Sequence, residues 1–167
     1  LGIVRDCRSP RFLVENLPAM TDLLQASGDK TDIQSILSEL KKELSEGVGR
    51  QAAELELGRL GSLDDLKAAS AGPAPALAAL ALVAQGEHLA AEGRLAEAEP
   101  LWLRVQQDPA GEPVPKGLAL LGLAGLEVAR GDADEAQSYL AELRSLTTDP
   151  WFLQEAAGID EDLAAAR

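Results

Sequence analysis

The sequence contains few of the side chains from which active sites and metal sites are most often built. Cys7 is the only cysteine and His88 the only histidine among 167 residues. One cysteine cannot form an internal disulfide, and one histidine cannot supply a histidine-rich metal site or a choice of triad histidines. No glycine-rich phosphate loop follows a strand-like segment. We therefore predict that the chain is not an enzyme and binds no cofactor or metal.

Aromatic side chains are also scarce. They make up 3% of the sequence, whereas hydrophobic residues of all kinds make up 46% and are mainly Ala and Leu. Small aliphatic side chains suit helices that approach closely, while strands are enriched in aromatic and β-branched residues. At 167 residues the chain can bury a core and has the size of one ordinary domain. The composition therefore predicts an all-α fold.

Basic side chains are too few to balance the acidic ones. The sequence has 15 Lys and Arg against 28 Asp and Glu, which gives a net charge of −13. Such a chain repels phosphate backbones and anionic lipid, whereas nucleic-acid binding normally needs clusters of Lys and Arg. We predict that nucleic acid is not a partner. The acidity fits a solvated surface that keeps the protein soluble and monomeric, and a basic partner is the alternative.

Long apolar runs are missing. The run at residues 76–84 ends at Gln85, well short of the ~20 residues that span a bilayer. We therefore predict no membrane span in this chain. Because the sequence begins with Leu1 rather than Met, we expect a fragment or a processed product, from which a signal peptide, a membrane anchor or a neighbouring domain has been removed.

What the sequence does have is glycine at nearly regular intervals. Gly28, Gly61, Gly93 and Gly131 lie between helix-like segments and stand 33, 32 and 38 residues apart. A glycine followed by a polar or capping residue marks a boundary between helices. A period of about 34 residues is typical of arrays of helical hairpins, in which each unit buries its apolar face against its neighbours.

Two of these segments match each other closely. After both Gly93 and Gly131 the sequence reads Gly-x-x-x-Glu-Ala and continues as an apolar stripe at helical spacing. Each predicted helix is closed by a proline, Pro109 in the first case and Pro150 in the second. The helices before them also correspond, and each carries a small residue where its partner helix would approach. These two segments therefore predict two similar hairpins.

The second half of the sequence resembles the tetratricopeptide repeat (TPR) family. The resemblance covers residues 75–150 and rests on a pattern of small and bulky residues closed by a proline: Gly86, Leu89, Gly93, Ala98, Trp102 and Pro109. It implies an all-α, right-handed superhelical array of antiparallel helix hairpins with a terminal capping helix. Residues 73–149 would form two TPR-like hairpins, and residues 150–167 the C-terminal capping helix.

Residues 1–72 are less regular and are expected to form an irregular helical front half, with degenerate repeats as one interpretation. Apolar spacing predicts a helix over 31–46 and a short hairpin made of 50–60 and 62–71. The segment 71–75, rich in Gly and Pro, is the predicted joint between the two halves.

Three residues that attract attention have simpler interpretations. Cys7 lies among arginines that could lower the pKa of its thiol, but it has no evident acid or base partner, so we predict no reactive role. Trp102 falls on an expected buried stripe and Trp151 begins the expected capping helix, so we predict core or capping roles for both.

The clustered carboxylates stand at expected helix starts, where the helix dipole favours negative charge.

The TPR resemblance also implies a binding surface. The first helix of each TPR lines a concave groove, and carrying that register over gives the predicted partner-binding residues: Leu80, Val83, Glu87, Leu118, Leu121 and Val128. This apolar groove would suit a helix laid lengthwise or a hydrophobic extended segment. Chaperone-binding TPR domains clamp a carboxylate with Lys, Arg and Asn, but Val83 and Glu87 stand at these points, so no clamp is expected. The alternative occupants are the chain's own front half and a second copy in a homodimer.

Two loops, at 108–115 and 147–151, look like those of bacterial YfgM-type TPR-like domains, which are ancillary to the Sec translocon. That resemblance implies the bacterial cell envelope, an anchor upstream of Leu1 and contact with exported proteins; a cytoplasmic location is the alternative. We expect a non-catalytic interaction module, or scaffold, whose partner is a protein or peptide. The alternative function is a regulatory or oligomerisation domain cut from a larger enzyme or transcription regulator.

Overall fold

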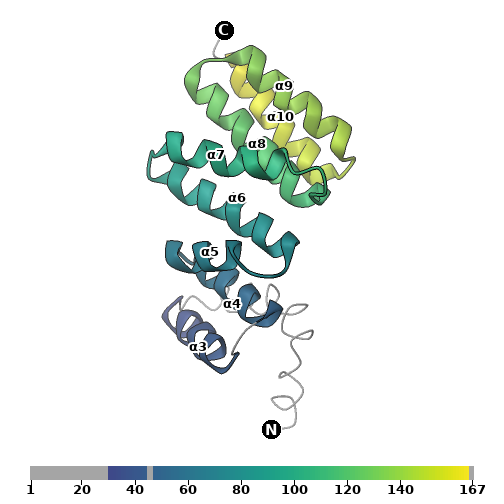
Figure 1. Ribbon diagram of the computed structural model, residues 1–167. Coiled ribbons are helices and arrows are strands. Elements are labelled where there is room, and N and C mark those ends of the chain that lie inside the picture. Colours follow the sequence, from purple (N-terminus) through teal and green to yellow (C-terminus); the bar gives the residue numbers. More distant parts are fainter. Residues whose placement is uncertain (1–29, 45–46, 166–167) are drawn as a thin grey trace. The chain divides into compact units, whose positions relative to one another are not determined.

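The computed structural model describes residues 30–44 and 47–165, and every regular element within these residues is an α-helix (Figure 1). The predicted all-α class is therefore confirmed for this part of the chain. Two compact units make up the chain, Leu1–Ala84 and Gln85–Arg167, which we term the first and the second unit. Helix α6 (Pro75–Ala91) contributes residues to both units.

The first unit contains three helices that the sequence predicted in its front half. They are α3 (Lys30–Glu43), α4 (Val48–Arg59) and α5 (Leu63–Ser70). The helix predicted over 31–46 ends three residues early at Glu43, and the predicted hairpin corresponds to α4 and α5. Residues 71–74 form the turn between α5 and α6, at the predicted joint.

The start of α5 is fixed by a side-chain cap. The hydroxyl of Ser62 accepts a hydrogen bond from the backbone N–H of Asp65, with a donor–acceptor distance of 3.3 Å. Ser62 has extended backbone angles, as an N-cap residue should, and two aspartates in the first turn complement the helix dipole. Gly61, just before Ser62, has a φ of 116°, a backbone conformation in which a residue with a side chain would be strained.

Helix α4 is the centre of the first unit. It packs against α3 and against α5, and its residues from Gln51 to Gly58 are all buried. A side chain at Gly58 would collide with Leu66 of α5, so this glycine lets the two helices approach closely. One apolar cluster joins Leu37 of α3 to α4, and a second joins α4 and α5 to α6 through Leu55, Leu66, Ala69 and Ala81.

The second unit contains the end of α6 and four further helices. These are α7 (Leu95–Gln106), α8 (Pro113–Arg130), α9 (Ala133–Leu146) and α10 (Pro150–Ala165). Gly93 and Gly131 end α6 and α8 with φ of 77° and 79°, as the glycine spacing predicted, whereas Gly28 lies outside the described residues. Pro150 is the first residue of α10, where the missing N–H of proline costs no helical hydrogen bond.

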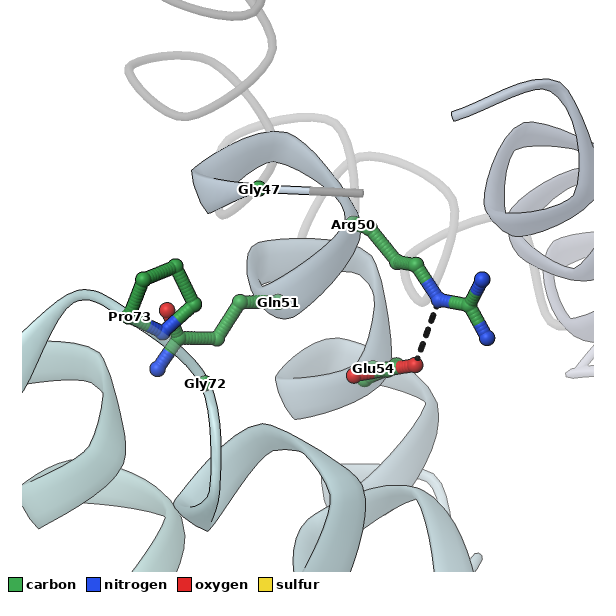
Figure 2. Close-up of a pocket in the computed structure, with 6 residues that line it drawn as sticks. All are labelled: Gly47, Arg50, Gln51, Glu54, Gly72 and Pro73. Atoms are coloured by element: carbon green, nitrogen blue, oxygen red, sulfur yellow. Dashed lines mark hydrogen bonds and ion pairs between the residues drawn. The ribbon is translucent and has the colours of Figure 1, made fainter. Parts of the chain in front are cut away.

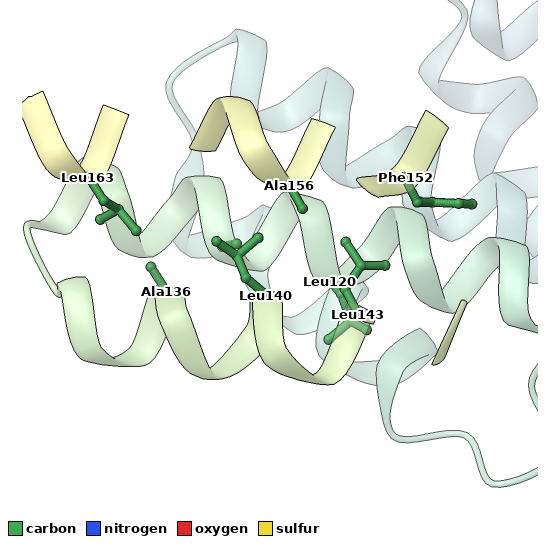
Figure 3. Packing of buried hydrophobic residues seen from close by; sticks show 8 residues of the cluster. Leu120, Ala136, Leu140, Leu143, Phe152, Ala156 and Leu163 are labelled. Carbon is green, nitrogen blue, oxygen red and sulfur yellow. The ribbon is translucent and has the colours of Figure 1, made fainter. Parts of the chain in front are cut away.

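The core of the second unit is aliphatic. Helix α8 packs against α7 and α9, and α10 lies against both α8 and α9. Figure 3 shows the buried cluster that these last three helices share, here termed the C-terminal cluster: Leu120, Ala124, Ala136, Leu140, Leu143, Phe152, Ala156 and Leu163. Each of the three helices contributes one small alanine to this cluster, which allows the helices to pack closely.

Trp102 of α7 is the largest buried side chain of the second unit. It is 3% exposed, so the predicted core role is confirmed. Cβ atoms added at Gly86 of α6 and at Gly122 of α8 would both collide with its indole ring. The two glycines therefore leave the space that the ring fills.

The boundary predicted from the sequence and the division between the two compact units lie at different residues. The predicted boundary at residues 72 and 73 falls in the turn between α5 and α6, while the compact units divide after Ala84, inside α6. Helices that follow one another in the sequence pack together, as in hairpins, in the pairs α3–α4, α4–α5, α7–α8, α8–α9 and α9–α10. The right-handed superhelix stays a prediction.

Candidate partner-binding surface

Helix α8 carries a line of apolar residues that is not fully covered. Between Lys116 and Glu127 it has no charged residue, so apolar side chains occur all around its circumference. Five positions recur at helical spacing along one side and are termed the α8 stripe: Val114, Leu118, Leu121, Gly125 and Val128. Val114 is 53% exposed, Gly125 is exposed, and the other three are partly buried. The α8 stripe is therefore an apolar line open in part to solvent.

The neighbours of α8 show where this stripe lies. A Cβ atom at Gly117 would come within 2.7 Å of Phe152 of α10, and one at Gly122 within 2.6 Å of Trp102 of α7. Because residues in an α-helix are about 100° apart, the stripe occupies the arc between these two contacts. A Cβ atom at Gly125 would meet nothing within 4 Å, which agrees with open space at the middle of the stripe.

The inner edge of the stripe rests on the core. Leu118, Leu121 and Val128 pack against the C-terminal cluster with part of their surface. Their position is therefore fixed by packing, and a partner that contacts them would find apolar surface that is already ordered.

Helix α10 borders the stripe on one side. Phe152, Ala156 and Leu163 point into the core (Figure 3). Asp160 faces α9, because it accepts hydrogen bonds from Gln137, at 2.8 Å, and from Arg144. By helical spacing, the residues on the opposite edge of α10, toward α8, are Trp151, Glu155 and Asp162. All three are exposed.

Trp151 lies at the start of α10, the predicted capping helix, but its side chain does not lie in the core. Its side chain is 49% exposed, and its ring packs edge to face on Phe152 with the ring centroids 4.9 Å apart. Phe152 takes the buried position instead, because it is in register with Ala156 and Leu163. Asp149 caps the first turn by accepting a hydrogen bond of 2.9 Å from the backbone N–H of Trp151.

The predicted partner-binding residues separate into three groups. Leu118, Leu121 and Val128 lie together on the α8 stripe of the second unit. Glu87 also belongs to the second unit and is exposed. Leu80 and Val83 belong to the first unit.

The two residues of the first unit have little surface to offer. Leu80 is partly buried against the cluster of Leu55 and Leu66. Val83 is 2% exposed and lies in the run 81–83, in which every residue is buried. Since α6 is apolar around most of its circumference, periodicity could not tell which of its sides would be covered, and the structure places Val83 in the interior instead of on a binding surface.

Sequence reasoning missed Val114 and the exposure of Trp151. Val114 stands four residues before Leu118, so the same periodicity could have found it. The sequence predicts a loop over 108–115, whereas α8 begins at Pro113 and includes Val114.

The first unit has a pocket of about 530 Å³, lined by Gly47, Arg50, Gln51, Glu54, Gly72 and Pro73 (Figure 2). The side chain of Gln51 is buried beside it and is held by the backbone. Its Nε2 donates to the carbonyl oxygens of Ala69, at 2.8 Å, and Ala74, at 3.0 Å, and its Oε1 accepts from the N–H of Ala74 at 2.8 Å. Gln51 thus fastens the turn after α5 to α4, which is a structural role.

The charged groups of this pocket also pair with one another. Arg50 donates from Nε to Oε1 of Glu54 at 3.0 Å, and Nζ of Lys41 lies 3.8 Å from the same oxygen. Lys41 also pairs with Asp65 of α5. These ion pairs connect α3, α4 and α5, and they account for the buried carboxylate of Glu54 without a ligand.

Ion pairs connect the helices of the second unit in a similar way. Arg130 of α8 pairs with Glu99 of α7 and with Glu127, whose side chain is largely buried. The hydrogen bond from Arg130 lowers the pKa of Glu99 below its ordinary value. For Tyr139, burial and the nearby Glu135 raise the pKa of the hydroxyl. The shift of Glu99 therefore accompanies an ion pair between two helices, and that of Tyr139 accompanies burial on α9.

Two kinds of site do not occur in the part of the chain that the structure describes. Among residues 30–44 and 47–165 no group of three or more His, Cys, Asp or Glu side chains could hold a metal ion. Within the same residues no helix has the length and apolar character to cross a bilayer. Cys7 lies outside them. No protein-family model matches the chain, and it has no significant match among curated proteins or solved structures.

Proposed function

We propose that this chain is a non-catalytic, TPR-like interaction module that holds a helix or a hydrophobic segment of a partner protein along the α8 stripe. The observation that carries the proposal is the partial exposure of five apolar positions in line on one helix, with Trp151 beside them. Ordered apolar surface with an exposed aromatic residue is typical of binding surfaces.

The size of the stripe suits a helix laid alongside it. From Val114 to Val128 the stripe covers 14 residue steps, or about 21 Å at the rise of an α-helix. A partner helix of about four turns would match this length. Its apolar residues would recur every three to four positions, as in other helices that bind to grooves.

The polar groups of the described residues support a non-catalytic role. Buried Glu54 and Glu127 are paired with arginines. Asp132 caps α9 by accepting a hydrogen bond from the backbone N–H of Glu135 at 3.1 Å. Capping and helix pairing therefore explain these carboxylates.

The test is to replace residues of the stripe with Glu in the full chain and to measure partner capture by photo-crosslinking at position 118. Leu121→Glu and Val114→Glu should abolish the crosslinked partner band while circular dichroism keeps its helical signal. The matched control is Leu153→Glu, since Leu153 is 38% exposed on the edge of α10 that faces α9. This control should keep the band. Loss of helicity in both stripe variants would show that these residues act only as core, and the proposal would then fail.

A further inference from the structure

The two units differ in charge. Residues 1–84 carry nine Lys and Arg against 12 Asp and Glu, whereas residues 85–167 carry six against 16, a net charge of −10. In the second unit Arg94, Arg130 and Arg144 are each paired with carboxylates. Most of the acidic side chains of this unit are therefore left without a neutralising neighbour, and they give it a negative field.

Part of this charge lies beside the α8 stripe. Glu155 and Asp162 are exposed on the edge of α10 toward α8, seven residues apart, and Trp151 begins the same edge. The structure shows no ion pair for Glu155 or Asp162 among the described residues. Seven residues are two helical turns, so the two carboxylates line up along the stripe about 10 Å apart.

This arrangement decides between the occupants of the stripe. A second copy of the chain would bring another acidic unit against the same face, and like charges in contact oppose binding. A segment with basic residues beside its apolar ones would make apolar contacts with the stripe and ion pairs with Glu155 and Asp162. Resting on the function proposed above, we infer that the occupant is a cationic amphipathic helix of another protein, with Lys or Arg at positions seven residues apart along one edge.

The binding test uses the full-length chain and two synthetic helical peptides of about 18 residues. Both carry the same leucine stripe; one has Lys along one edge, and the other has Glu at the same positions. Trp151 reports binding because it is half exposed, whereas Trp102 is already buried. The Lys peptide should shift the tryptophan emission to shorter wavelength and bind at least about tenfold more tightly than the Glu peptide. In Trp151→Phe the shift should disappear.

Charge reversal on α10 locates the effect. The double variant Glu155→Lys, Asp162→Lys should weaken binding of the Lys peptide about tenfold and strengthen binding of the Glu peptide. The matched control is Glu161→Lys. Glu161 is exposed on the side of α10 opposite Phe152, so its reversal should leave both affinities within about twofold.

The outcomes separate this inference from the proposed function. Equal affinity for the two peptides, with binding of both lost in Leu121→Glu, would show that the partner need not be cationic. The α8 stripe would then stay the proposed binding surface. Binding unaffected by Leu121→Glu would remove the surface itself. A dimeric mass in sedimentation that returns to the monomer in Leu121→Glu would show a second copy on the stripe and would also overturn the inference.

Discussion

The two units bury their central helices in different ways. In the first unit α4 is buried along most of its length, although it contains Gln51, Glu54 and Glu56, and each of these finds a polar partner. In the second unit α8 is apolar for ten successive residues, and three other helices pack around it without covering all of it. The polar helix is thus enclosed, while the apolar one keeps a stripe in partial contact with solvent.

The comparison shows that burial depends on where the neighbours of a helix lie around it, and not on its own hydrophobicity alone. A buried polar side chain is tolerated where hydrogen bonds replace those to water, as for Gln51. An exposed apolar stripe has an unfavourable contact with water that a partner could remove. We therefore assign a structural role to the polar contacts of α4 in the first unit and place the proposed binding surface in the second unit.

The comparison can be tested most strongly at Trp102, the buried tryptophan of the second unit. Trp102→Ala should lower the free energy of unfolding by about 4 kcal/mol, because it empties the space between Gly86 and Gly122. Urea unfolding measures the loss, and hydrogen exchange should show it in the second unit. The control Trp151→Ala should cost less than about 1 kcal/mol, since Trp151 is half exposed. Similar losses for both tryptophans would contradict the packing described here.

The first unit should depend on one polar side chain. Gln51→Leu keeps the volume but removes the hydrogen bonds to the backbone of Ala69 and Ala74, so we expect a loss of about 2 kcal/mol in the free energy of unfolding. Hydrogen exchange should show earlier opening of the turn at 71–74. Gln154→Leu, at an exposed position of α10, should change stability by no more than about 0.5 kcal/mol. If Gln51→Leu has the same free energy of unfolding as the unsubstituted protein, these hydrogen bonds do not contribute to stability.

Within α8, alanine substitutions at two glycines three residues apart should change stability in opposite directions. Gly122→Ala places a methyl group 2.6 Å from the ring of Trp102 and should destabilise the protein by about 2 kcal/mol. Gly125→Ala meets open space and should stabilise it by up to about 1 kcal/mol, because alanine favours the helix. Thermal unfolding of both variants measures the difference. If Gly125→Ala also destabilises, the middle of the α8 stripe is covered.

The smallest expected effect is a dependence on pH. Arg130 lowers the pKa of Glu99, so the folded protein holds this carboxylate ionised more strongly than the unfolded chain does. Glu99 therefore contributes stability above the ordinary Glu pKa of about 4.3, and this contribution is lost as the pH falls through the lowered value. The stability difference between the protein and Glu99→Gln, measured by urea unfolding, should be present at pH 7 and vanish in acid. The exposed Glu161→Gln should show no such difference.

Local signals in the sequence were sufficient for the helices. Gly61, Gly93 and Gly131 marked helix ends because only glycine adopts their positive φ without strain. Ser62 is recognisable in the sequence as an N-cap because its hydrogen-bond partner, Asp65, lies only three residues away. The TPR resemblance picked out Leu118, Leu121 and Val128, and helical periodicity places these three residues on one side of α8.

Contacts between distant segments could not be predicted in the same way. The place of Val83 in the interior depends on which sides of α6 are covered, and the exposure of Trp151 depends on how α10 rotates to bury Phe152. In the sequence, Gln51 is one of several polar residues of α4, and only the folded chain brings the backbone of Ala69 and Ala74 to its side chain.

The sequence by itself therefore determined the all-α class, the helix ends and the acidity of the second half, because composition, caps and glycine conformations act over a few residues. The tertiary structure alone decided which apolar side of each helix is covered and which stays open. It did so because an apolar helix is compatible with neighbours on any side, and only the packing of α7, α9 and α10 around α8 leaves the stripe beside Glu155 and Asp162.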